Sequence, residues 1–146
     1  ERAQRFLHDP GISVVAPARL APEIAEVHAM HDPTEGGVLT GLLEIARAAK
    51  VGLTVDLDAI PLLPEGVVLC REFGLDPLGV IASGALLLTV ARPDAPRLVE
   101  GLAAAGYRAA IIGQVAEPAA GLTALRDGQR VPWPTYAADE ITKIFA

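Results

Sequence analysis

The sequence is poor in cysteine and carries no excess of positive charge. Cys70 is the only cysteine among 146 residues, which excludes an intramolecular disulfide and argues against a cysteine-based zinc cluster. A single thiol suits a reducing compartment, so we expect a cytoplasmic protein. The net charge of −6 gives no general attraction to nucleic-acid phosphates or to anionic membranes. Neither nucleic acid nor a membrane is therefore an expected partner.

Long apolar runs and aromatic side chains are also scarce. The run over residues 80–90 is interrupted by Ser83 and Gly84, and it falls short of the ~20 residues that a membrane-spanning helix needs. Aromatic residues make up 4% of the chain, whereas hydrophobic residues make up 51%. The core must therefore consist mainly of Ala, Val, Leu and Ile, which suits helices packed on a sheet. The length fits one domain, residues 1–146.

Helical patterns occur at several places along the chain. The clearest covers residues 38–50, where Leu39, Leu42 and Ala46 recur on one helix face. Asp94 is expected to cap another helix, which carries Pro96 in its first turn. The remaining patterns predict shorter helices over residues 2–8, 18–25, 65–73 and 137–145.

Strand patterns alternate with these helices. Residues 80–90 are expected to hold a central strand, and residues 122–131 a hairpin that turns at Asp127-Gly128. Further strands are predicted over residues 26–30, 53–57 and 109–115, and residues 12–15 form a short β-branched run. These elements together predict an α+β domain in which helices pack on a mixed sheet.

The loop His31-Asp32-Pro33-Thr34-Glu35-Gly36-Gly37 lies between a predicted strand and the clearest helix. Gly36 and Gly37 would let a ligand approach the backbone, and the free amides of a helix start attract anions. Asp32 and Thr34 add a carboxylate and a hydroxyl beside that position, suited to a metal-bound nucleotide. The residues therefore indicate a phosphate-binding loop.

An ordinary capped helix start explains the same residues, because Asp, Thr and Gly are also what helix caps use. The loop is not a P-loop, since no Gly-Lys-Ser or Gly-Lys-Thr follows it. His28 and His31 have neither the spacing of a helical metal pair nor a third ligand. No metal-ligand set and no catalytic residue can be assigned from the sequence.

Three ordered motifs resemble the HypE family of hydrogenase-maturation proteins, within the AIR-synthase-related superfamily. The first is the loop at residues 31–37 followed by Leu43-Glu44-Ile45-Ala46, the second is Gly74-Leu75-Asp76-Pro77-Leu78, and the third is Ala110-Ile111-Ile112-Gly113-Gln114-Val115. The resemblance implies the fold of an AIR synthase C-terminal domain. It also implies that Asp32, Thr34, Gly36 and Gly37 face nucleotide phosphates or substrate, with His31 and Glu44 in support.

The same resemblance implies partners and cofactors that belong to a longer protein. An N-terminal domain would bind ATP and mediate homodimerisation, and the complete protein would use ATP and Mg. The chain begins Glu-Arg-Ala-Gln without an initiator Met, which indicates a fragment that lacks that domain. Residues 1–146 alone are expected to require no cofactor and to be inactive.

The sequence also departs from the HypE pattern. Glu35 stands where the family signature has Arg, and the chain ends at Phe145-Ala146 without the terminal cysteine of that family. Cys70 lies inside a predicted helix, so we expect it in the core. Two functions remain open: part of an ATP-dependent enzyme for phosphoryl transfer or ATP-driven dehydration, or a non-catalytic module for nucleotide sensing or assembly.

Overall fold

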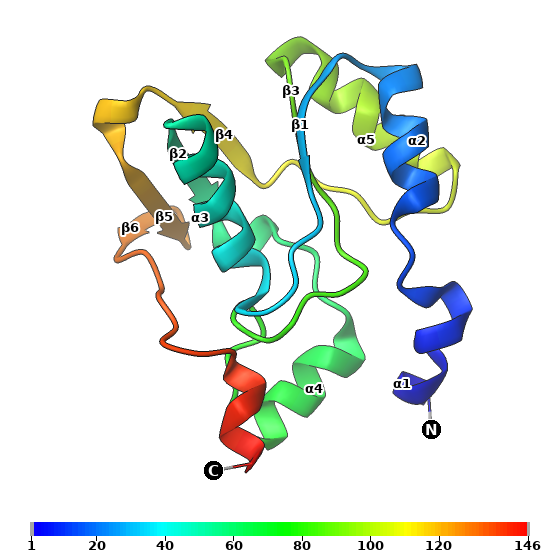
Figure 1. Cartoon of the computed structure of the whole chain (residues 1–146), viewed down its shortest axis with the longest axis vertical. Helices are drawn as coiled ribbons and strands as arrows, with labels where there is room; N and C mark the ends of the chain where they lie inside the picture. Colours follow the sequence, from blue (N-terminus) through cyan, green and yellow to red (C-terminus); the bar gives the residue numbers. More distant parts are fainter. Residues whose placement is uncertain (1, 146) are drawn as a thin grey trace.

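The computed structural model describes residues 2–145, in which helices pack against two small sheets (Figure 1). The first sheet pairs β1 (Val27–His31) with β3 (Leu87–Val90) in antiparallel orientation. The second has the order β4-β2-β5-β6, formed by β4 (Gly113–Ala116), β2 (Gly52–Asp56), β5 (Leu122–Arg126) and β6 (Gln129–Val131). Its central pair, β2 and β5, is parallel, whereas its outer pairs are antiparallel. The predicted α+β class with a mixed sheet is therefore confirmed.

Helix α3 (Gly37–Ala49) forms the larger core with the second sheet. Its apolar face carries Leu39 and Leu42, which are 1% and 7% exposed. Val55 of β2 and Ala124 of β5 are buried in the same cluster. The helical periodicity of the sequence thus corresponds to one continuous buried stripe.

Helices α2 (Val15–Ile24) and α5 (Ala95–Ala104) form a second, smaller core on the first sheet. Figure 1 shows the two helices side by side, next to β1 and β3. Gly101 permits their close approach, because a Cβ there would lie 2.5 Å from Cδ1 of Ile24. Among residues 2–145, no helix has the length and hydrophobicity that crossing a bilayer requires.

The remaining elements are short. Two helical segments open the chain, α1 (Arg2–Arg5) and a π-helical turn over Leu7–Gly11, so the helix expected over residues 2–8 is split. Helix α4 (Pro64–Glu72) matches the prediction for residues 65–73, and it buries Cys70 as expected. Burial raises the pKa of the Cys70 thiol, and the charges of Asp76 and Glu140 raise it further. The 3₁₀ turns span Leu57–Ala59, Arg92–Asp94, Pro118–Ala120 and Glu140–Phe145.

One strand prediction holds only in part, and a β-branched run of the sequence is not a strand. The β-branched run over residues 12–15 leads into α2, with Pro17 in its first turn, where the fixed φ of proline favours a helix start. The central strand expected over residues 80–90 is a strand only at Leu87–Val90, where it pairs with β1 alone. A turn precedes it, closed by the hydrogen bond from the Ala85 amide to the Ala82 carbonyl, 2.9 Å.

Three further predictions need correction at their ends. Asp94 makes no capping hydrogen bond, because its carboxylate accepts instead from Arg97. The strand expected over residues 109–115 begins only at Gly113. The C-terminal helix predicted over residues 137–145 is a 3₁₀ turn that begins at Glu140.

The hairpin predicted over residues 122–131 is confirmed. Strands β5 and β6 pair in antiparallel orientation, and Asp127 and Gly128 at the turn both have positive φ, 50° and 70°.

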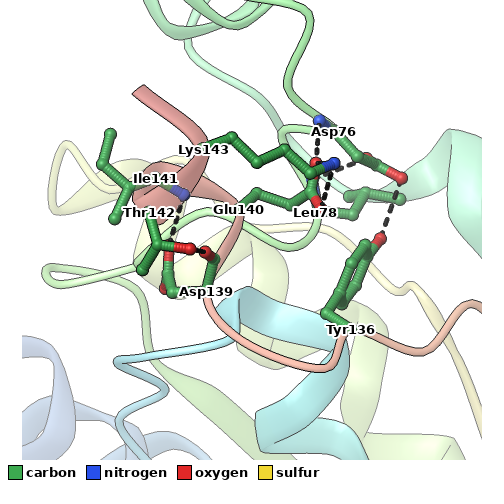
Figure 2. A network of polar contacts seen from close by, with 8 residues as sticks. All are labelled: Asp76, Leu78, Tyr136, Asp139, Glu140, Ile141, Thr142 and Lys143. Carbon is green, nitrogen blue, oxygen red and sulfur yellow. Dashed lines mark hydrogen bonds and ion pairs between the residues drawn. The ribbon is translucent and has the colours of Figure 1, made fainter. Parts of the chain in front are cut away.

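The C-terminal segment docks onto the loop that follows α4 (Figure 2). The Tyr136 hydroxyl donates to Oδ2 of Asp76 at 2.8 Å, and the Asp76 amide donates to Oε2 of Glu140 at 3.0 Å. Lys143 pairs with the same Glu140 carboxylate at 2.7 Å. The Tyr136 ring packs directly against Gly79, because a Cβ added to Gly79 would lie only 2.6 Å from the ring carbon Cζ. Two segments far apart in sequence are thereby held together.

The docking of Glu140 predicts an acid-sensitive stability. The Asp76 amide and Lys143 hold the pKa of the Glu140 carboxyl below its ordinary value of 4.5. A lowered pKa contributes stability that is present above the ordinary value and is lost as pH falls through the folded-state value. Urea unfolding at pH 6 and pH 3 should therefore show a smaller loss of stability for Glu140→Gln than for the parent chain. The exposed Glu100→Gln is the control, and equal losses in all three proteins would contradict the assignment.

Candidate functional site

The Gly-Gly pair of the loop over residues 31–37 fits closely against a second loop. Gly36 and Gly37 have φ values of 77° and 70°, which side chains rarely adopt. A Cβ on Gly37 would lie 2.3 Å from the Leu78 carbonyl oxygen and 2.8 Å from that of Val80. Glycine is thus required here by the protein's own packing.

The amides of the two glycines are already hydrogen-bonded within the protein. The Gly36 amide donates to Oδ2 of Asp139 at 2.7 Å, and the Gly37 amide donates to the Thr34 carbonyl at 3.1 Å. Both glycines are buried, and buried amides in native proteins almost always have partners. This differs from the expectation of free amides aimed at a phosphate, because the Asp139 side-chain carboxylate occupies the position in front of the helix start.

Asp32 and Thr34 instead border a shallow hollow beside the loop. Its volume is about 180 Å³, and Ser83 and Gly84 line it together with Ile12, Val14 and Pro33. The Thr34 carbonyl accepts a hydrogen bond from the Ala82 amide at 3.1 Å, which fixes this second turn against the loop. The two turns thus present a carboxylate and two hydroxyl groups to one small space.

Two acidic side chains lie on this loop, of which Asp32 lines the hollow and Glu35 follows the lining residue Thr34 in sequence. Asp32 and Glu35 are both exposed. The Thr34 hydroxyl and the amide of Glu35 itself hold the pKa of the Glu35 carboxyl below its ordinary value. The Asp32 carboxylate makes no hydrogen bond or ion pair with any residue in the range 2–145. A bare phosphate would be repelled here unless a cation lies between.

His31 and Glu44 fix the entry to the loop. Nε2 of His31, at the end of β1, lies 2.7 Å from Oε2 of Glu44 on α3. The Glu44 side chain is 57% exposed, so the pair adds little stability in water. Its contribution is geometric, since it joins the strand before the loop to the helix after it.

The structure thus places Asp32, Thr34, Gly36 and Gly37 in one loop, but only the first two of them line the hollow. Asp32 and Thr34 reach the hollow, whereas the glycines set the shape of the loop. A hydrated Mg²⁺ carrying a phosphate fits such a border, because Mg²⁺ keeps several waters and takes only one or two carboxylates. Within residues 2–145, no group of three or more His, Cys, Asp or Glu side chains could enclose a metal ion.

Sequence reasoning missed Asp139, which comes from the C-terminal segment and caps the helix start from 103 residues away. Figure 2 shows Asp139 beside Glu140, whose carboxylate binds the neighbouring loop. In the sequence, Asp139 and Glu140 stand out only as two adjacent acidic residues. Their distance along the chain from Gly36 and Gly37 gives no indication of a contact.

Residues 13–123 match the family described as AIR synthase related protein, C-terminal domain. A carbamoyl dehydratase HypE from Rhizobium leguminosarum bv. viciae is 41% identical over 93 residues, which make up 62% of this chain and 27% of that protein. The chain therefore spans about a quarter of the length of this curated relative.

Solved structures of HypE share the fold. The crystal structure of HypE from E. coli, a hydrogenase maturation protein, superposes with a TM-score of 0.77 at 28% identity, covering 90% of this chain and 42% of that one. A crystal structure of the hydrogenase maturation protein HypE in complex with ATP gives a TM-score of 0.70 at 26% identity, covering 81% of this chain and 38% of that one. The predicted AIR synthase C-terminal fold is confirmed.

The packing of Gly37 yields a prediction about stability. Gly37→Ala should destabilise the fold by about 2–5 kcal/mol, from a left-handed alanine and from a clash with the Leu78 carbonyl. Gly74 has φ 65° but no atom within 4 Å of a Cβ, so Gly74→Ala isolates the backbone cost of about 1–2 kcal/mol. Urea unfolding measures the loss of stability in both variants. Equal losses would show that the contact between Gly37 and the Leu78 carbonyl does not contribute to stability.

The cap at the start of α3 yields a second prediction. Asp139→Ala removes the acceptor for the amides of Gly36 and Ile141, 2.7 and 2.9 Å away, and should cost about 1–2 kcal/mol. Asp94→Ala is the matched control, because Asp94 precedes α5 without capping it and should cost less than about 0.5 kcal/mol. Thermal and urea unfolding compare the two. A cost for Asp139→Ala no larger than that of the control would refute the cap.

Proposed function

The chain belongs to the C-terminal-domain family of AIR-synthase-related proteins, and we propose that it is part of an ATP-dependent, HypE-like enzyme. The similarity to a carbamoyl dehydratase and to a HypE that binds ATP supports this proposal. In it, the chain contributes the hollow beside Asp32 and Thr34, which receives the phosphate end of a nucleotide or an activated substrate. The reaction is a phosphoryl transfer or an ATP-driven dehydration.

One observation carries this assignment: the Asp32 carboxylate borders the hollow and has no partner among the residues that the structure describes. When bound, Mg²⁺ would supply positive charge that offsets the phosphates. Asp32 would hold the waters of that ion, and the Ser83 hydroxyl would orient a phosphate oxygen. The Thr34 hydroxyl, which donates to Glu35, would accept a hydrogen bond from one of those waters. Such chemistry depends on positioning more than on bond-making side chains.

Gly36 and Gly37 act indirectly in this proposal. Their positive φ values place Thr34 against the turn at Ala82, and their amides hold Asp139 and the Thr34 carbonyl. His31 and Glu44 fix the other end of the loop. The phosphate-facing surface is therefore made of side chains rather than of helix amides.

The rest of the site would come from outside this chain. The curated relative is more than three times as long as the matched segment, which covers 27% of it. We propose an N-terminal ATP-binding domain in the same polypeptide and a homodimer of the complete protein. Half a site cannot position both reactants, so the 146 residues alone should bind nucleotide weakly and catalyse nothing.

A non-catalytic nucleotide-sensing or assembly module is the second candidate. Glu35 places a negative charge beside the hollow, and the Gly36 and Gly37 amides are already used. Both features weaken attraction to phosphate. Turnover by the complete protein would favour the enzyme, whereas tight nucleotide binding without turnover would favour the module.

Titration of the chain with MgATP, followed by NMR, tests the site. Amide shifts should appear at residues 32–34 and 82–84, with a dissociation constant on the order of millimolar. Asp32→Asn or omission of Mg²⁺ should weaken binding by about 5-fold or more. Glu26→Gln, directly before β1 and outside the lining of the hollow, should leave binding unchanged.

Two results would contradict the proposal. Amide shifts confined to other surfaces would remove the hollow from consideration. Metal-dependent ATP hydrolysis by the 146 residues alone would show that the site is complete without a second domain.

A further inference from the structure

A second cavity lies at the carboxyl ends of the two parallel strands. Its volume is about 500 Å³. Leu57 and Asp58 directly follow β2, and Arg126 is the last residue of β5. Since the two strands run parallel, their carboxyl ends meet at one edge of the sheet, where ligands of open sheets commonly bind. None of the residues that line this cavity lines the hollow beside Asp32.

The walls of the cavity are mostly apolar and belong to the fixed core. Leu57, Ile60 and Leu78 are 4%, 8% and 3% exposed. Leu62 and Pro77 complete the apolar lining. A cavity of this size with such walls favours a ligand that has an apolar body.

The acidic groups at this cavity already have partners. Oδ1 of Asp76 accepts from the Leu78 amide at 2.9 Å, and its Oδ2 accepts from the Tyr136 hydroxyl, as Figure 2 shows. Oδ2 of Asp58 accepts from the Asp127 amide at 2.6 Å. Both oxygens of Asp76 and one oxygen of Asp58 thus accept hydrogen bonds from the protein itself.

Arg126 is the positively charged side chain of the cavity lining, and it has no partner within the described chain. Its side chain is exposed, and it makes no hydrogen bond or ion pair with the rest of the described chain. A guanidinium presents a planar pair of donors that matches a carboxylate in a bidentate arrangement. The cavity thus combines an apolar interior with one free cation.

We propose that this cavity binds a small carboxylate with an apolar body, whose carboxylate pairs with Arg126. The apolar part would lie against Leu57, Ile60 and Leu78, and water would leave those walls on binding. Charge and shape together define the ligand class: a carboxylate can pair with Arg126 in a bidentate arrangement, an amine would be repelled by Arg126, and an alcohol would lack the ion pair.

Three probes with the same body test the proposal by NMR titration: 3-phenylpropionate, 3-phenylpropanol and 3-phenylpropylamine. The carboxylate should bind at least about 10-fold more tightly than the other two. Its amide shifts should centre on residues 57–62, 76–78 and 126–127. Tighter binding of the amine, or no binding of the carboxylate, would overturn the assignment.

Two variants localise the contact. Arg126→Gln should weaken 3-phenylpropionate binding about 10-fold, whereas Arg130→Gln, on the adjacent strand and outside the cavity lining, should not. Leu62→Trp should fill the cavity and abolish binding. Circular dichroism establishes that each variant is folded, and equal binding by the Arg126→Gln and Arg130→Gln variants would refute the role of Arg126.

Discussion

The structure around the candidate site depends on the hydrogen bond from the Gly36 amide to the Asp139 carboxylate. This contact joins the start of α3 to a segment 103 residues later in the chain. Without it, the buried Gly36 amide directly before α3 would have no partner, which is costly. The carboxylate also offsets the positive end of the helix dipole. One side chain therefore stabilises the loop and occupies the place where an anion would otherwise bind.

The position of Asp139 bears directly on the proposed binding of a nucleotide at this loop. With the glycine amides used internally and the Thr34 hydroxyl donating to Glu35, the groups left to meet a ligand are the Asp32 carboxylate, the oxygen of the Thr34 hydroxyl and the turn at Ser83. The border that they form is acidic, so it suits a cation-bound phosphate better than a free one. The loop thus works as a shaped support for side chains.

The fold was readable from the sequence where local patterns decide it. The apolar stripe of residues 38–50 and the turn at Asp127-Gly128 predicted α3 and the hairpin, because periodicity and positive φ act within a few residues. The strand expected over residues 80–90 forms only at Leu87–Val90, since an apolar run alone does not separate a loop from a strand, and residues 80–86 form a partly exposed loop.

The candidate site was readable only in part. The sequence identified the loop and its polar side chains, and the motifs indicated the family. Asp139 could not be found in this way, because its contact with Gly36 is set by tertiary packing. The sequence also suggested open amides, since a Gly-Gly turn before a helix serves equally for ligand approach and for close packing. Only the positions of Leu78 and Val80 decide between these uses.

Hydrogen exchange at the Gly36 amide, measured by NMR with and without MgATP, tests this account most directly. A hydrogen bond to Asp139 predicts slow exchange in the free protein and the same slow exchange when nucleotide is present, while the signals of residues 32–34 shift. Fast exchange in the free protein that becomes slow only on addition of nucleotide would show that the amide serves the phosphate, and the account would be wrong.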